Sequence, residues 1–393
     1  MKKLKKFFQE FRWGALSVSF LLCACCAQEE ACEYLPLDIS KNSLTLDSDP
    51  FELCESNQSE LAVFNALFLD ENGYKLPGNP DPKFLLSVFN DLRNAYHQED
   101  EILASELIQK KYHTFTHAID VLVTTHALLQ NGGSIFLTED EQAGLLLAAL
   151  GHDALHLGVN NAYLENSSHP LIKKFGSEGV QEKRSAAFLS DLLDKYGLLL
   201  PQEKTNNHLL ASHNEVRKMI EHSILYTDFK RNKELMLRMK QVVPDLLTQL
   251  HSANDQTAQV SLPSEKAKYG SATIDLSGQL DSDTRILIGS FILHAADVSN
   301  PGKKWPVCER WANLIMEEFF GQGDLEKSNG MKPSMNCDRL TVKTSECQLG
   351  FGKHVVQDLF ETLAEIIPKG GRVLISNLEA NQAKWQRLKD QSD

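Results

Sequence analysis

The chain has 393 residues, of which 42% are hydrophobic and 24% are charged, the composition of a globular protein with room for one large domain or two ordinary ones. Its formal net charge of -13 at pH 7 argues against nucleic-acid binding as its main task. An anionic substrate would need local positive charge, which bound cations could supply.

The first 49 residues predict a leader followed by a linker. Basic residues among the first twelve positions precede an apolar stretch over 13–27, which is shorter than the ~20 residues that a membrane-spanning helix needs. Three interpretations stay open: a cleaved signal peptide, an unstructured leader, or a membrane anchor acylated at Cys23, Cys25 and Cys26. The eight cysteines do not suggest a disulfide framework, so we expect a reduced, cytoplasmic protein that such an anchor would attach to a membrane.

From about residue 50 onward the pattern is helical, and we expect one all-α, compact multi-helix domain over 50–393. Asp81-Pro82 is a good helix start. Thr138 and Glu141 form a capping box ahead of an apolar helix that leads to His152, and a second apolar helix over 285–296 leads to Asp297. No sustained alternation of polar and apolar residues predicts strands. Polar sequence with Pro and Gly predicts a surface loop at about 251–283.

Histidines and aspartates gather in three short segments beside apolar helical sequence. His113 and His117 are four residues apart, so on a helix they share one face. The second segment holds His152-Asp153 and His156, and the third holds Asp297. Buried imidazoles and carboxylates are costly unless they are paired or bound to metal, so the combination predicts a shared metal centre. Imidazole with carboxylate suits Zn²⁺, iron or Mn²⁺, while carboxylate with water suits Mg²⁺. A centre of this composition favours hydrolysis.

These segments and three others resemble the catalytic domain of class I 3′,5′-cyclic nucleotide phosphodiesterases, members of the HD superfamily. The matching segments occur in the order and spacing of that family across roughly residues 50–385. They are residues 112–121, 151–161, 296–301, 316–324, 337–339 and 348–351.

The resemblance implies a binuclear site with two divalent ions, Zn²⁺ and Mg²⁺, with Mn²⁺ as an alternative. The tightly held ion would be bound by four ligands, of which Asp153 would also bridge to the second ion: His117, His152, Asp153 and Asp297. The water molecules around the ions would be oriented by His156, Glu182, Thr227 and Asp228.

The same resemblance implies hydrolysis of the 3′ phosphoester bond of 3′,5′-cyclic nucleotides to 5′-nucleoside monophosphates, which terminates a cyclic nucleotide signal. A hydroxide shared by two cations about 3.5–4 Å apart would attack phosphorus. His113 would act as the general acid that protonates the leaving oxygen. Gln348 would face the purine edge, with Phe351 and Ile315 on either side of the ring. The full set of implied substrate-binding residues is Tyr112, Asn300, Ile315, Gln348 and Phe351.

Three features depart from the family pattern. Arg184 and Ser185 stand where the family has paired histidines, Phe229 stands where a smaller side chain such as Met is common, and Cys308 occupies a position that is often aromatic. None of them removes a ligand or the general acid, so we expect activity and leave substrate and inhibitor preference open.

Two other functions fit part of the pattern. Another metal-dependent nucleotide phosphohydrolase of the HD superfamily is disfavoured by the segments at 317–324 and 348–351, which belong to the narrower family. An inactive cyclic nucleotide sensor is disfavoured because no ligand is lost. Asn300-Pro301 resembles members that act on cAMP, so we favour cAMP over cGMP. An intracellular substrate also favours an anchor over a cleaved signal.

Overall fold

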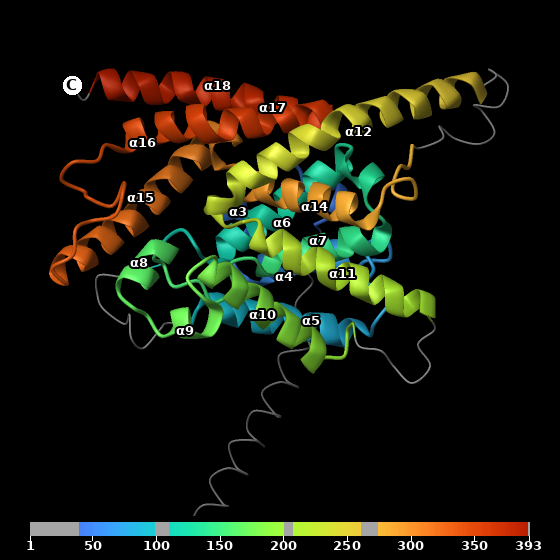
Figure 1. The fold of residues 1–393 in the computed structure, drawn as a ribbon, viewed down its shortest axis with the longest axis horizontal. Coiled ribbons are helices and arrows are strands. Elements are labelled where there is room, and N and C mark those ends of the chain that lie inside the picture. Colours follow the sequence, from blue (N-terminus) through green and yellow to red (C-terminus); the bar gives the residue numbers. More distant parts are fainter. Residues whose placement is uncertain (1–38, 99–109, 200–206, 261–273, 392–393) are drawn as a thin grey trace, which may run out of the picture. The chain divides into compact units, whose positions relative to one another are not determined.

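The computed structural model describes residues 39–98, 110–199, 207–260 and 274–391 (Figure 1). Within these ranges helices are the regular structure and no strand is present, as the sequence predicts. The α-helices are α3 (Pro50–Leu53), α4 (Asn57–Phe64), α5 (Pro82–Tyr96), α6 (Phe115–Gln130), α7 (Glu139–Gly151), α8 (Asn161–Asn166), α9 (Leu171–Phe175), α10 (Val180–Lys195), α11 (Asn207–Leu225), α12 (Asn232–Val260), α14 (Ser282–Asp297), α15 (Trp305–Ser328), α16 (Thr344–Phe351), α17 (Gln357–Ile366) and α18 (Pro368–Asp390). Short 3₁₀-helices are η1 (Lys41–Ser43), η3 (Gly133–Phe136), η4 (Phe229–Arg231) and η5 (Asn300–Gly302), and short π-helices are η2 (Asn65–Leu69) and η6 (Gly352–Val356).

Helix α7 is the centre of the hydrophobic core. It packs against α6, α10, α11 and α14, and every residue from Ala143 to Gly151 is buried. The predicted capping box is present: Thr138 Oγ1 accepts the Glu141 N–H at 3.2 Å, and Glu141 Oε2 accepts the Thr138 N–H at 2.9 Å. Each buried leucine of this helix contributes about 1.5–3 kcal/mol through the area it removes from water.

Helices α7 and α14 run side by side in the same direction. The Glu141 carboxylate in the first turn of α7 accepts a hydrogen bond of 2.8 Å from Arg285 Nε in the first turn of α14, and the Glu141 side chain is only 1% exposed. The two helices therefore begin together and, being of similar length, also end together. Their carboxyl ends carry His152 and Asp297, so the fold alone brings two of the predicted metal ligands to one place.

The helices from α15 onward pack beside that point. Helix α18 contacts α16, α17 and η5, and α15 contacts α16 and η5. Figure 1 shows these red and orange helices together at one side of the molecule. They carry Glu318, which contacts His113, and they also carry the predicted base-binding residues Ile315, Gln348 and Phe351.

The predicted linker is wrong where the structure describes it, from residue 39. Leu44 and Leu46 are 4% and 6% exposed and belong to the hydrophobic core. His126 Nε2 donates to the Lys41 carbonyl at 3.0 Å, while its Nδ1 lies 3.0 Å from the Tyr74 hydroxyl. These contacts hold the segment against the core, so the folded unit extends upstream of residue 50.

The predicted loop at 251–283 is also wrong in its first part, because α12 runs on to Val260. The sequence 251–260 is polar but contains neither Gly nor Pro, so nothing in it breaks the helix before Pro263. Residues 261–273 lie outside the described ranges, and residues 274–281 form turns and irregular structure before α14.

The predicted leader lies outside the described residues as well, up to residue 38. Among the helices that the structure does describe, none is long and apolar enough to cross a membrane.

Candidate metal centre and active site

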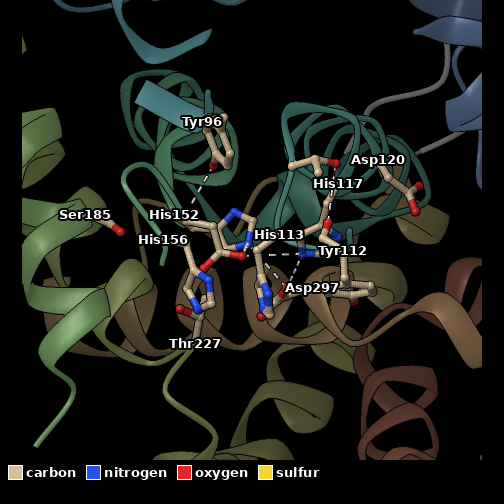
Figure 2. A network of polar contacts seen from close by, with 12 residues as sticks. Tyr96, Tyr112, His113, His117, Asp120, His152, His156, Ser185, Thr227 and Asp297 are labelled. Atoms are coloured by element: carbon tan, nitrogen blue, oxygen red, sulfur yellow. Dashed lines mark hydrogen bonds and ion pairs between the residues drawn. The ribbon is translucent and has the colours of Figure 1, made fainter. Parts of the chain in front are cut away.

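Four predicted ligands converge at the carboxyl ends of α7 and α14 and the first turn of α6. Asp297 Oδ1 lies 3.0 Å from His117 Nε2 and 3.3 Å from His152 Nε2. Asp153 Oδ2 lies 3.1 Å from His152 Nε2 and 3.7 Å from His117 Nε2. One ligand atom from each residue falls within 4.8 Å of the others. Figure 2 labels three of the four, His117, His152 and Asp297.

The donor set fits a divalent cation. His152 Nδ1 lies 2.8 Å from the Ala149 carbonyl, which can only accept, so Nδ1 carries a proton and Nε2 is the nitrogen that faces the carboxylates. Burial alone would lower the pKa of His152, but Asp153 and Asp297 raise it well above its usual range, so a cation bound here would displace the Nε2 proton. Within the described part of the chain, that Nε2 is buried and forms no hydrogen bond of good geometry, although both carboxylates lie near it. Burial opposes ionisation of the two carboxylates, but the neighbouring histidines hold the pKa of Asp153 and Asp297 well below the usual range. Both carboxylates are therefore ionised. Two imidazoles and two carboxylates around one point are the ligands that Zn²⁺ and similar ions prefer.

Tyr96, which the sequence analysis missed, orients Asp153. The last residue of α5, it is fully enclosed; its hydroxyl donates to the Leu150 carbonyl at 2.9 Å and accepts the Asp153 N–H at 3.2 Å. Tyr96 continues the apolar face of α5 one turn beyond Leu92. A tyrosine at the buried end of an apolar helix face needs a partner for its hydroxyl, and that was the available signal.

His113 lies beside this cluster and is held by Glu318, a second residue that the sequence analysis did not assign. Glu318 Oε1 contacts His113 Nδ1, and Oε2 accepts the backbone N–H groups of Lys111 and Tyr112, both at 2.9 Å. Burial alone would lower the pKa of His113, but Glu318 and Asp153 outweigh it and raise that pKa to about 9. Burial likewise opposes ionisation of Glu318, yet His113 lowers its pKa to about 2. The pair is therefore an imidazolium and a carboxylate.

The residues predicted to orient water lie on the other side of His113. The His156 ring stacks on the His113 ring with centroids 3.7 Å apart, and burial together with His113 lowers the pKa of His156 to about 3. Glu182 in the first turn of α10 accepts from Asn161 Nδ2 at 2.9 Å, and burial and the Asp228 carboxylate raise its pKa to about 7. Asp228 is buried at the start of η4, next to Thr227. This side presents oxygen atoms suited to ordered water around a hard cation.

Tyr112 and Asn300 are joined by a buried hydrogen-bond network. The Tyr112 hydroxyl donates to Asn300 Oδ1, and Asn300 Nδ2 donates to Asp120 Oδ2 at 3.3 Å. Asp120 also accepts from Lys303 Nζ at 2.6 Å and from Trp311 Nε1 at 2.9 Å. Both ends of the Asn300 amide are thus occupied from within the protein, which fixes its orientation. The predicted purine contact of Asn300 stays a prediction.

The residues predicted to bind the base lie on two neighbouring helices, α15 and α16. Ile315 on α15 and Gln348 and Phe351 on α16 are all half-buried. The centroids of the Phe351 and Phe229 rings lie 6.2 Å apart, and Phe229 is 51% exposed. Phe229, which departs from the family pattern, is therefore a neighbour of the predicted base-binding residue Phe351. Their roles stay predictions. Cys308 is buried, and burial raises the pKa of its thiol to about 12.

Comparison with known proteins now identifies the fold. The family model described as 3′5′-cyclic nucleotide phosphodiesterase matches residues 112–377. A solved structure of LmjPDEB1 in complex with IBMX aligns with a TM-score of 0.70 and 22% identity, covering 92% of this chain and 96% of that one. The phosphodiesterase domain of Salpingoeca rosetta rhodopsin phosphodiesterase gives a TM-score of 0.68 and 23% identity, covering 90% and 96%. The predicted all-α phosphodiesterase-type fold is confirmed.

Curated relatives agree. The isoform F of 3′,5′-cyclic-AMP phosphodiesterase from Drosophila melanogaster is 30% identical over 311 residues, which is 78% of this chain and 41% of that protein. The 3′,5′-cyclic-AMP phosphodiesterase 4C of Mus musculus is 27% identical over 346 residues, which is 85% of this chain and 46% of that protein. The chain thus spans less than half the length of these relatives. With a family model over most of its length and the metal-ligand cluster in place, this chain belongs to the 3′,5′-cyclic nucleotide phosphodiesterase family.

Proposed function

We propose that this protein hydrolyses 3′,5′-cyclic nucleotides, with cAMP preferred over cGMP, to 5′-nucleoside monophosphates. The observation that carries the proposal is the Glu318–His113 pair beside the His117, His152, Asp153 and Asp297 cluster. An anionic phosphodiester needs cationic stabilisation, and its alkoxide leaving group needs a proton. The two halves of this site supply those two requirements.

His117, His152, Asp153 and Asp297 would hold one divalent ion, with Asp153 shared with a second, and Zn²⁺ and Mg²⁺ are the ions we propose. When bound, the two ions would supply positive charge to the phosphate and lower the pKa of water to near neutrality. Glu182, His156 and Asp228 would orient the water molecules around them. The elevated pKa of Glu182 is consistent with this role, because burial and the nearby Asp228 carboxylate disfavour its ionised form and bound cations would offset both effects.

His113 would protonate the leaving 3′ oxygen. Its Nδ1 points at the ionised Glu318 and carries a proton, so the ring is fixed and Nε2 is the atom left to transfer a proton. Cations bound nearby would lower the pKa of His113, and the Glu318 carboxylate opposes that effect. The imidazolium can therefore persist near neutral pH in the loaded site, which is the form that a general acid requires.

The substrate would lie between the metal centre and α16. Gln348 would form hydrogen bonds to the purine edge, because its amide both donates and accepts. Phe351 and Ile315 would contact the two faces of the ring. Tyr112 and Asn300 would shape the inner wall. The preference for cAMP is supported by the curated relatives, whose names specify cyclic AMP.

The test separates proton donation from metal chemistry. We expect His113→Gln to reduce cAMP turnover by about 10²–10⁴-fold, the usual range for a general acid, without lowering bound metal. A p-nitrophenyl phosphodiester has a leaving group that needs no proton, so its turnover should fall much less in the same variant. Equal losses for both substrates would contradict the role given to His113, and release of 3′-AMP instead of 5′-AMP would contradict the bond assignment.

The N-terminal prediction stays a proposal: residues 1–32 would attach the protein to the cytoplasmic face of a membrane. Fusion of this segment to a fluorescent reporter tests it. Membrane fluorescence that disappears when Cys23, Cys25 and Cys26 are replaced by Ser supports an anchor, whereas diffuse cytosolic fluorescence or secretion contradicts it.

A further inference from the structure

A strained turn joins two residues of the site. Residues Asp153 to His156 form a four-residue turn closed by the His156 N–H, which donates to the Asp153 carbonyl at 3.0 Å. Within it, Leu155 has φ +66°, the left-handed conformation that disfavours every residue with a Cβ. The Leu155 side chain packs against the hydrophobic core, which explains why the position is not glycine. This turn sets the direction of both Asp153 and His156.

One face of α10 forms hydrogen bonds to the backbone of this turn and of the segment that follows it. Gln181, Arg184 and Ser185 are spaced i, i+3 and i+4, so they lie on the same side of the helix. Ser185 Oγ donates to the Ala154 carbonyl at 2.8 Å, with the Gln181 carbonyl of its own helix as a second, longer acceptor at 3.0 Å. Arg184 Nη1 donates to the Leu155 carbonyl at 3.0 Å.

Gln181 continues the same pattern downstream. Its Oε1 accepts the Leu157 N–H at 2.9 Å, and its Nε2 donates to the Val159 carbonyl at 2.7 Å. Ser185 and Gln181 are 1% and 3% exposed, so these hydrogen bonds are shielded from water. Figure 2 shows Ser185 on its helix beside the turn that carries His156.

We propose that Arg184 and Ser185 are positioning residues that hold the strained turn and thereby set the affinity of the site for its divalent cation. They bind the two successive carbonyls on either side of the left-handed Leu155 φ angle. Without them the turn would relax toward an ordinary conformation, and the Asp153 carboxylate would move away from His117 and His152. Arg184 and Ser185, which stand where the family has paired histidines, would thus be the residues that fix the metal ligand Asp153 in this chain. The inference deepens the proposed function and rests on its metal centre.

The test measures metal affinity without substrate. Zn²⁺ is partitioned between the full-length protein and a chromophoric chelator, for the wild type and for the double variant Arg184→Met with Ser185→Ala. Loss of residues that orient a metal ligand without binding the metal themselves costs about 10–100-fold in metal affinity. We expect a loss in that range for the double variant. Ser185→Thr, which keeps the hydroxyl, should bind like the wild type.

Ser190→Ala is the matched control, because Ser190 lies on the same helix and accepts from Arg217 Nη1 at 3.3 Å, away from the turn. It should leave Zn²⁺ affinity unchanged. A circular dichroism melt confirms that each variant is folded.

Adding Leu155→Gly to the double variant separates positioning from general damage. Glycine adopts φ +66° without strain, so the turn no longer needs the two side chains and Zn²⁺ affinity should recover by several-fold. The same substitution removes a packed leucine, so the melting temperature should fall further. Opposite movement of affinity and melting temperature is what the proposal predicts.

Three results would overturn it: unchanged affinity in the double variant, no recovery with Leu155→Gly, or a wild type that binds no Zn²⁺. Failure of the proposed function is seen separately. A wild type that binds Zn²⁺, and whose affinity depends on Arg184 and Ser185, would support this inference even if it hydrolysed no cyclic nucleotide.

Discussion

The buried ion pair between Asp120 and Lys303 should be a large determinant of stability and of the substrate-binding wall. Both side chains are almost completely enclosed, at 2% and 1% exposure, with Oδ1 and Nζ 2.6 Å apart. We consider Asp120→Asn, which keeps the volume and removes the charge. An amide has one acceptor and one donor end, so it cannot serve both Lys303 Nζ and Trp311 Nε1, and Lys303 is left as a buried cation without a counter-ion.

Removing one partner of a buried ion pair typically costs about 3–5 kcal/mol, and we expect Asp120→Asn to lower the free energy of unfolding by that amount. Replacing Lys303 by Met in the same chain removes the stranded cation. Because a buried pair replaced by a neutral pair of similar volume is often close to neutral, the double variant should lie within about 2 kcal/mol of the wild type.

The assay is urea unfolding followed by circular dichroism, with linear extrapolation to water. EDTA is present throughout so that bound metal does not contribute. A cost below about 1 kcal/mol for Asp120→Asn, or a double variant as unstable as the single one, would refute the reasoning. In active enzyme the double variant should also raise KM more than it lowers kcat, because Asn300 loses the carboxylate that fixes its amide.

Three further predictions follow from other contacts. Glu318→Gln removes the charge that raises the His113 pKa to about 9, so that pKa should fall toward or below its ordinary 6.5. The kcat of the variant should then decline as the pH rises from 6 to 8, whereas the kcat of the wild type should not. A variant whose pH–rate profile matched that of the wild type would count against the pair. Removal of metal by EDTA should lower the free energy of unfolding of the wild type by about 2.7 kcal/mol, relative to protein with free metal at a concentration of 100 Kd. It should not change the stability of Asp297→Ala. A melt with and without EDTA measures both effects. Thr138→Ala removes the hydroxyl of the α7 capping box and should cost about 1 kcal/mol in urea unfolding, with no change in metal affinity; a neutral result would mean that the Glu141–Arg285 pair alone sets the start of α7.

The helices and the ligand cluster were accessible from the sequence because both depend on local patterns. We predicted α5 and α7 from apolar residues at helical spacing, together with the Asp81-Pro82 start and the Thr138 capping box. The structure has both helices. His152 and Asp297 each follow a nearly all-apolar helix, where an unpaired imidazole or carboxylate is costly. Such residues stand out against their surroundings.

What the sequence did not reveal depends on contacts between distant segments. Glu318 lies 205 positions from His113. It shares a helix face with Trp311 and Ile315, so a carboxylate on an apolar face was visible, but not its partner. The partners of Tyr96 and Asp120 were hidden for the same reason.

The two misplaced boundaries, at Leu44 and in α12, have different causes. Leu44 is a core residue flanked by polar sequence, and the helix through 251–260 has no breaker even though it is polar. For residues 251–260, polarity alone therefore predicted the secondary structure incorrectly.

The central claim is that the four-residue cluster and His113 make this chain a cyclic nucleotide hydrolase. The most direct measurement is hydrolysis of cAMP and cGMP, side by side, by the full-length protein with Zn²⁺ and Mg²⁺, with Asp297→Ala as the control. We predict turnover of cAMP to 5′-AMP with a higher kcat/KM than for cGMP, and its loss in the variant. No turnover of either nucleotide by metal-loaded wild type, or turnover that survives in Asp297→Ala, would contradict the account.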